Sequence, residues 1–137
     1  MKEKLPLSKQ IAYSLGQFGW SLLSGIVASY LIFYYIPTKE SGIMIVIPQV
    51  AFLGFLTIIG LITMLGRFFD AITDPWIATL SDRSKSKKGR RISFMQKASV
   101  PFALSTVLVF WSPVEGESPI NAIFLTVVLL SFYLFLT

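Results

Sequence analysis

The chain has 137 residues, of which 54% are hydrophobic and 14% are charged, and its mean hydropathy is +0.70. Soluble domains carry about 25% charged residues, so this composition excludes an ordinary soluble domain. The chain has no cysteine and no histidine, which excludes a disulfide framework, thiolate chemistry and the side chain that usually titrates near neutral pH.

Long uncharged runs dominate the sequence and are separated by short polar segments. A helix of about 20 apolar residues crosses a bilayer core about 30 Å thick, so the runs predict an all-α membrane protein with four transmembrane helices. The first run follows a basic start and is too long for a signal-peptide core, which indicates a retained helix. The four helices are expected at about residues 11–36, 48–80, 92–112 and 119–137.

The basic residues predict the orientation of these helices. Of the twelve lysines and arginines, three precede the first helix and seven lie between Arg83 and Lys97. Because cytoplasmic loops are enriched in lysine and arginine, we expect the N-terminus and a basic loop at residues 82–91 to be cytoplasmic. A loop this short, held between two spans, is not expected to bind nucleic acid, and its expected partner is the lipid bilayer.

The first helix carries a pattern of small residues. Ala12 and Gly16 are four positions apart, and a second such pair begins at Ser21. In lipid, small residues let helix backbones approach closely, so one interpretation is a packing face. A second interpretation is that Gln17, Trp20 and Ser21 face a water-filled cavity. An amide and an indole are suited to a hydroxylated ligand, which they would bind by hydrogen bonds and stacking.

The second helix contains "RFFDAITDPW", an unusual concentration of charge for a membrane span. Thr63, Arg67, Asp70 and Asp74 follow one another by four, three and four positions, so they form one stripe on one helix face. One charge at the bilayer centre costs about 2.5–3.5 kcal/mol, which favours a polar interior for this face. One arginine neutralises one aspartate. The other needs a proton, a bound cation or a basic partner on another helix.

Pro75 adds a further oxygen atom to this stripe. Proline has no amide hydrogen, so the carbonyl of Ala71 loses its helical partner. Together with Asp70, Asp74 and the hydroxyl of Thr73 it forms an oxygen-rich group suited to a hard monovalent cation. An Arg–Asp clamp between helix ends explains the same residues equally well. Hydropathy alone leaves the membrane depth of the two aspartates open.

The stripe and the loop after it resemble a known family. "GRFFDAITDPWIATLSDRSKSKKGRR" is similar to the second-helix signature of the glycoside-pentoside-hexuronide:cation symporters of the major facilitator superfamily, and the similarity extends to "YSLGQFGWSLLSG" and "YLIFYY" in the first helix. Members have twelve helices in two six-helix halves. The resemblance therefore implies four helices of an N-terminal half with a cytoplasmic N-terminus, and we expect a longer protein that supplies further C-terminal helices.

The resemblance also implies residue roles. Asp70 and Asp74 would be ligands of the coupling ion, Na+ or H+, with Thr73 between them, and both would be metal ligands if the ion is Na+. Arg67 would line the substrate pathway. Members that carry melibiose have a sugar-binding acid in the first helix, where this chain has Ser21. The implied cytoplasmic gate consists of Asp82, Arg83, Gly89 and Arg90.

The stripe and the family resemblance together predict a cation-coupled secondary transporter of sugars or glycosides that works by alternating access in the cell membrane. Its partners would be a small-molecule substrate, a carbohydrate, and a monovalent cation. We expect no catalytic residues and no cofactor other than the coupling ion. Two alternatives remain: a carrier of lysolipids or other amphiphiles on the same scaffold, and a non-transport four-helix membrane assembly protein.

Overall fold

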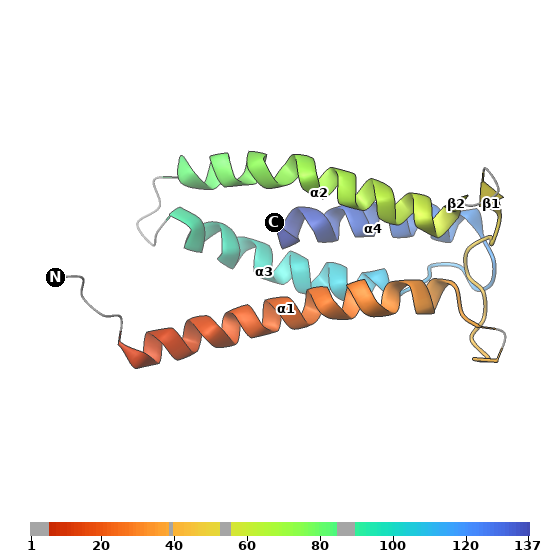
Figure 1. Cartoon of the computed structure of the whole chain (residues 1–137), viewed down its shortest axis with the longest axis horizontal. Coiled ribbons are helices and arrows are strands. Elements are labelled where there is room, and N and C mark those ends of the chain that lie inside the picture. The colour runs from red at the N-terminus through yellow and green to blue at the C-terminus, as the bar shows by residue number, and fades with distance from the viewer. Residues whose placement is uncertain (1–5, 39, 53–55, 85–89) are drawn as a thin grey trace.

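The computed structural model describes residues 6–38, 40–52, 56–84 and 90–137. Four helices run alternately up and down, so two ends of the bundle can be distinguished (Figure 1). The open end holds the start of α1, the end of α2 and the start of α3, and the loop end holds the opposite termini. The elements are α1 (Leu7–Tyr35), β1 (Ala51–Phe52), β2 (Leu56–Thr57), α2 (Ile58–Asp82), α3 (Arg90–Val109) and α4 (Pro119–Leu136).

Three of these helices are long and apolar enough to cross a membrane: α1, α3 from Ile92 onward, and α4. The fourth, α2, has 25 residues but carries the charged stripe identified in the sequence. It packs against α4 and α3 within the same bundle. The all-α architecture predicted from the hydrophobic runs is therefore confirmed, apart from a two-stranded antiparallel pair, β1–β2, before α2.

The prediction that the second helix begins at Pro48 was wrong, because α2 begins at Ile58. Thr57 lies in an extended conformation before the helix, and its side chain accepts a hydrogen bond of 3.1 Å from the amide of Gly60. Threonine is a favoured N-cap because its oxygen satisfies one of the unpaired amides of the first turn. The helix then continues to Asp82, two residues beyond the predicted end.

The segment before α2 is extended because other elements bind its backbone. The amide of Asn121 on α4 donates to the Val46 carbonyl at 2.8 Å. The amide of Gln49 donates to the carbonyl of Tyr35, the last residue of α1, at 3.0 Å. Ile47, between them, is 1% exposed. Hydropathy cannot distinguish such a buried extended segment from an apolar helix.

The other helices differ from the predicted bounds by a few residues. Helix α1 begins at Leu7 rather than residue 11, because its first turn includes polar residues that hydropathy does not register. Helix α3 begins at Arg90 and ends at Val109, three residues before the predicted end. Helix α4 begins at Pro119, after the capping side chain of Ser118, which accepts from the Ile120 amide.

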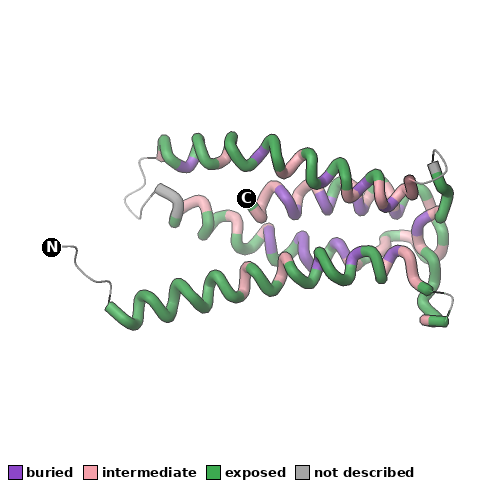
Figure 2. The backbone as a smooth tube through the Cα atoms, viewed as in Figure 1, coloured by how far each residue is buried: buried purple, intermediate pink, exposed green. Residues whose placement is uncertain are grey.

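The apolar core lies toward the loop end (Figure 2). Every residue from Pro6 to Phe18 is exposed, whereas Val27, Leu31 and Tyr35 further along α1 are buried. Helix α4 packs against both α2 and α3, and α1 packs against α3. The charged side chains of α2 therefore lie along a bundle that is closed at one end and open at the other. The remaining buried apolar residues are Ile47, Ile59, Ile62, Phe102, Val109, Leu125, Val128, Leu129, Phe132 and Tyr133.

Candidate functional site

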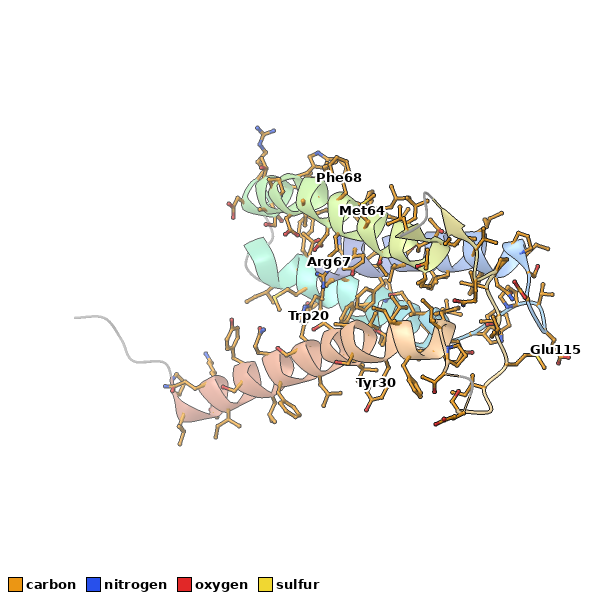
Figure 3. The ribbon with its side chains drawn as sticks, turned by 45° about the vertical axis from the view of Figure 1, so that its right-hand side comes forward. Trp20, Tyr30, Met64, Arg67, Phe68 and Glu115 are labelled. Atoms are coloured by element: carbon orange, nitrogen blue, oxygen red, sulfur yellow. The ribbon has the colours of Figure 1, made fainter. Side chains whose placement is uncertain are left out.

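Helix α2 separates its charged and apolar side chains onto different faces. In Figure 3, Arg67 points toward the space between the helices and Phe68 points away from it. Phe68 is 67% exposed and belongs to an apolar face that suits contact with lipid. The stripe of Thr63, Arg67, Asp70 and Asp74 is therefore directed inward, as its spacing predicts. The exposed apolar face consists of Leu61, Leu65, Phe68 and Ile72.

A cavity of about 870 Å³ brings predicted site residues from two helices together near the open end. Asp70 and Asp74 line it from α2, and Gln17 and Trp20 line it from α1. The indole of Trp20 stacks on the ring of Phe102, with 4.3 Å between ring centroids and 16° between planes. Two carboxylates thus line the same cavity as an amide and a stacked indole ring, and we call this space the aspartate cavity.

Arg67 lines a different cavity of about 330 Å³ with residues of α1, α2 and α4, and we call it the arginine cavity. The guanidinium carbon of Arg67 lies 5.3 Å from the centroid of the Tyr133 ring, within the range of a cation–π interaction. Gly66 allows this approach, since a Cβ at that position would lie 2.6 Å from Tyr133 Cε2. The structure therefore does not bring Arg67 into the cavity of the aspartates.

Thr73 and Ala71, predicted as further cation ligands, do not line the aspartate cavity. Thr73 is 5% exposed, and its hydroxyl donates to the Phe69 carbonyl at 3.0 Å and to the Asp70 carbonyl at 3.2 Å. Asp70 itself accepts a long hydrogen bond of 3.5 Å from the Thr137 hydroxyl. Among the described residues there is no cluster of three acidic, histidine or cysteine side chains able to hold a metal ion.

The predicted gate residues lie at the open end, as far as they are described. Asp82 is the last residue of α2, and the amide of Arg83 caps the helix by donating to the Thr79 carbonyl at 3.2 Å. Arg90 is the first residue of α3, whereas Gly89 and the side chain of Arg90 lie outside the described residues. Ser21, predicted for the substrate pathway, is exposed on α1 and lines neither cavity.

Lys97 and Tyr133, which line these cavities, were not predicted from the sequence as site residues. Lys97 on α3 lines the aspartate cavity, and it was counted only among the basic residues that set the topology. A signal was present, because Lys97 is the single charged residue between Arg91 and Glu115. Tyr133 on α4 could not be identified in this way, since nothing in the sequence distinguishes it from the other aromatic residues of an apolar helix.

Comparison with known proteins decides the family. A sequence model of the family described as MFS/sugar transport protein matches residues 12–137. The chain belongs to this family. Among the family's relatives, an uncharacterized symporter of Synechocystis is 37% identical over 102 residues, which are 74% of this chain and 16% of that protein. The symporter resemblance seen in the second helix is thereby confirmed, as is the assignment to a multi-pass membrane protein.

Two further relatives carry substrate names. A putative sulfoquinovose importer of Salmonella typhimurium is 33% identical over 134 residues, which are 96% of this chain and 25% of that protein. An isoprimeverose transporter of Lactiplantibacillus pentosus is 28% identical over 112 residues, 82% of this chain and 21% of that protein. The chain thus spans between 16% and 25% of the length of these curated relatives. No solved structure matches it.

Proposed function

We propose that the protein is a secondary transporter that moves a sugar or glycoside together with a monovalent cation. The observation that carries this proposal is that two carboxylates of α2 and two ligand-type side chains of α1 line one cavity. Such a cavity between helices is the kind of site that alternating access exposes to one side of the membrane and then to the other. Catalysis plays no part in this proposal.

The coupling cation is assigned to Asp70 and Asp74. Both carboxylates line the aspartate cavity, and the arginine of the same stripe is engaged with Tyr133 in the other cavity. Two negative charges in a membrane-embedded site are costly unless a proton or a cation neutralises them. Na+ or H+ would supply that charge. Thr73 and Ala71, which do not line the cavity in this structure, are assigned no direct contact with the cation.

The substrate is assigned to the wall opposite the aspartates. Trp20 offers an aromatic face, fixed by its stacking on Phe102, and Gln17 offers an amide to the same space. Aromatic faces and amides suit the apolar faces and hydroxyl groups of sugars. The names of two relatives, an isoprimeverose transporter and a putative sulfoquinovose importer, support a carbohydrate rather than a lysolipid.

We assign the open end of the bundle to the cytoplasmic side of the cell membrane. The start of α1 and the two helix termini that the basic loop joins, the end of α2 and the start of α3, lie at that end (Figure 1), and basic residues favour the cytoplasmic side. Asp82, Arg83 and Arg90, near the two ends of this loop, are assigned to the cytoplasmic gate. Gly89, the remaining gate residue implied by the family, belongs to the same proposal.

The proposal is tested by substitution of each aspartate in the full-length protein. Asp70→Asn and Asp74→Asn keep the size of the side chain and remove its charge, so we expect both to abolish cation-stimulated sugar uptake at normal expression. The matched control is Glu115→Gln, an exposed carboxylate at the loop end (Figure 3). Uptake into membrane vesicles is measured with an imposed Na+ gradient and then with an imposed pH gradient. Gradient-driven accumulation undiminished in both aspartate variants would refute the proposal.

A further inference from the structure

Three charged side chains line the aspartate cavity among the residues that the structure describes. Asp70 and Asp74 come from α2, and Lys97 comes from α3. The rest of the wall is largely apolar and includes Trp20 and Phe94. Charges interact more strongly across an apolar cavity than in water, because the effective dielectric constant is lower. The lysine therefore shares this cavity with the two carboxylates.

The fold places Lys97 and Asp74 at similar heights in the bundle. Asp74 lies about 12 Å before the end of α2 and Lys97 about 10 Å after the start of α3, at about 1.5 Å per residue. These two helix termini lie at the same end of the bundle, and the helices pack against each other. A lysine side chain is long and flexible, so its ammonium group has access to the carboxylates across the cavity.

Arg67, the expected partner of the aspartates, does not line the aspartate cavity. Its guanidinium lies over the ring of Tyr133 and lines the arginine cavity. The side chain of Gly66, a single hydrogen, leaves room for that ring. Among the described residues that line the aspartate cavity, Lys97 is the one cation, and the charge of Arg67 acts on Asp70 from outside it.

We propose that Lys97 is the resident counter-charge of Asp70 and Asp74 and competes with the coupling cation for these carboxylates. This inference rests on the proposed function, because it assumes that the two aspartates bind that cation. When the cation is absent, the ammonium group of Lys97 pairs with a carboxylate and limits the cost of an empty site. When the cation binds, it displaces the ammonium group, so Lys97 lowers the affinity for the cation and is a residue that determines coupling.

The size of the effect follows from the dimensions of the cavity. A space of 870 Å³ would be about 12 Å across if it were a sphere, and two unit charges at that separation alter a binding constant by about tenfold at an effective dielectric constant of about 20. Removing the charge of Lys97 is therefore expected to lower the cation concentration for half-maximal uptake by about tenfold.

The test compares three variants of the full-length protein. Lys97→Gln removes the charge, Lys97→Arg keeps it, and Lys9→Gln removes the charge of an exposed lysine on α1 that lines neither cavity. Sugar uptake into vesicles is measured against Na+ concentration at fixed pH, with choline chloride replacing NaCl, or against pH where a proton gradient drives uptake. We expect the tenfold shift, about one pH unit for protons, in Lys97→Gln alone.

The outcomes separate this inference from the proposed function. Half-activation of Lys97→Gln at the wild-type concentration, or an equal shift in Lys9→Gln, would overturn the role of Lys97, while Asp70→Asn still reports on the cation site. If Lys97→Gln transports nothing, cation affinity is measured on the purified protein from the rise of its melting temperature with NaCl or with acidification. An affinity equal to that of wild type in that experiment would also overturn the proposal.

Discussion

Polar side chains have different surroundings at the two ends of the bundle. At the loop end, polar side chains bind backbone groups of other elements: the hydroxyl of Tyr35 donates to the Val109 carbonyl at 2.7 Å, and Asn121 connects α4 to two loops. At the open end, Asp70, Asp74 and Lys97 face a cavity instead. Burial follows the same division, since most buried residues lie toward the loop end (Figure 2).

This difference indicates that the loop end stabilises the fold and that the open end forms the functional site. Satisfied hydrogen bonds and apolar contacts at the loop end stabilise the bundle. Charges and polar groups directed into a cavity destabilise it unless a ligand is bound, and this cost is typical of functional sites. Substitutions at the loop end should therefore change stability, whereas those at the open end should change transport with little effect on stability.

The largest loss of stability is expected for Asn121→Ala. The Asn121 amide donates to the carbonyls of Val46, Val114 and Gly116 at 2.8–3.0 Å, and the side chain is 1% exposed. Its loss removes this donor from the partly buried carbonyls of Val114 and Gly116, whereas Val46 still accepts from the Ser118 amide. The cost is about 3 kcal/mol in total, since each unsatisfied group costs about 1–3 kcal/mol. The measurement is thermal unfolding in detergent, followed by intrinsic fluorescence. Ser118→Ala, the loss of an exposed helix cap, is the control and should cost about 1 kcal/mol. Equal losses in both would contradict the comparison.

Gly66→Ala is expected to have the next largest effect. A Cβ at this position would lie 2.6 Å from Tyr133 Cε2, so α2 and α4 must move apart or the ring must turn. Overpacking of this kind typically costs about 1–3 kcal/mol. The control is Gly25→Ala, where nothing lies within 4 Å of the new atom and the helix propensity of alanine should stabilise by up to about 1 kcal/mol. Melting temperatures that shift in the same direction for both variants would show that the close approach is unimportant.

The sequence predicted the helices and the shared face of the charged residues, because both follow from periodic patterns. Charge-free runs located four helices, and the four-three-four spacing from Thr63 to Asp74 placed these charges on one face, because both features depend only on helix geometry. The stripe proved to be shared between two cavities, with Asp70 and Asp74 in one and Arg67 in the other. Which neighbour each side chain meets depends on α3 and α4, and spacing within α2 contains no information on that.

The extended segment before α2 shows the second limit. Residues near Pro48 are as apolar as a helix, and their conformation is set by partners far along the chain, such as Asn121 and Tyr35. Lys97 illustrates the same point at the open end. Its role in charge balance emerges only when α3 is placed beside α2. Non-local contacts of this kind cannot be derived from local patterns.

A smaller loss of stability is expected for Tyr35→Phe. The phenol is 1% exposed, and its hydroxyl bonds the Val109 carbonyl, which links the ends of α1 and α3. Removing one such bond typically costs about 1 kcal/mol. Tyr30→Phe is the matched control, because Tyr30 is 59% exposed and points away from the bundle in Figure 3. Its melting temperature should equal that of wild type, and a drop as large as that of Tyr35→Phe would assign the effect to the chemistry of the phenol rather than to its contact.

The smallest effect on stability, and a clear one on transport, is expected for Gln17→Ala. Gln17 is exposed and lines the aspartate cavity, and surface substitutions usually stay within about 0.5 kcal/mol of wild-type stability. Loss of one hydrogen bond to substrate, about 1 kcal/mol, should raise the KM for sugar uptake by about fivefold. Gln96→Ala, on an exposed face of α3 outside this cavity, should leave the KM unchanged. A lower melting temperature of the Gln17 variant with an unaltered KM would contradict the comparison, because a residue of the open end would then stabilise the fold.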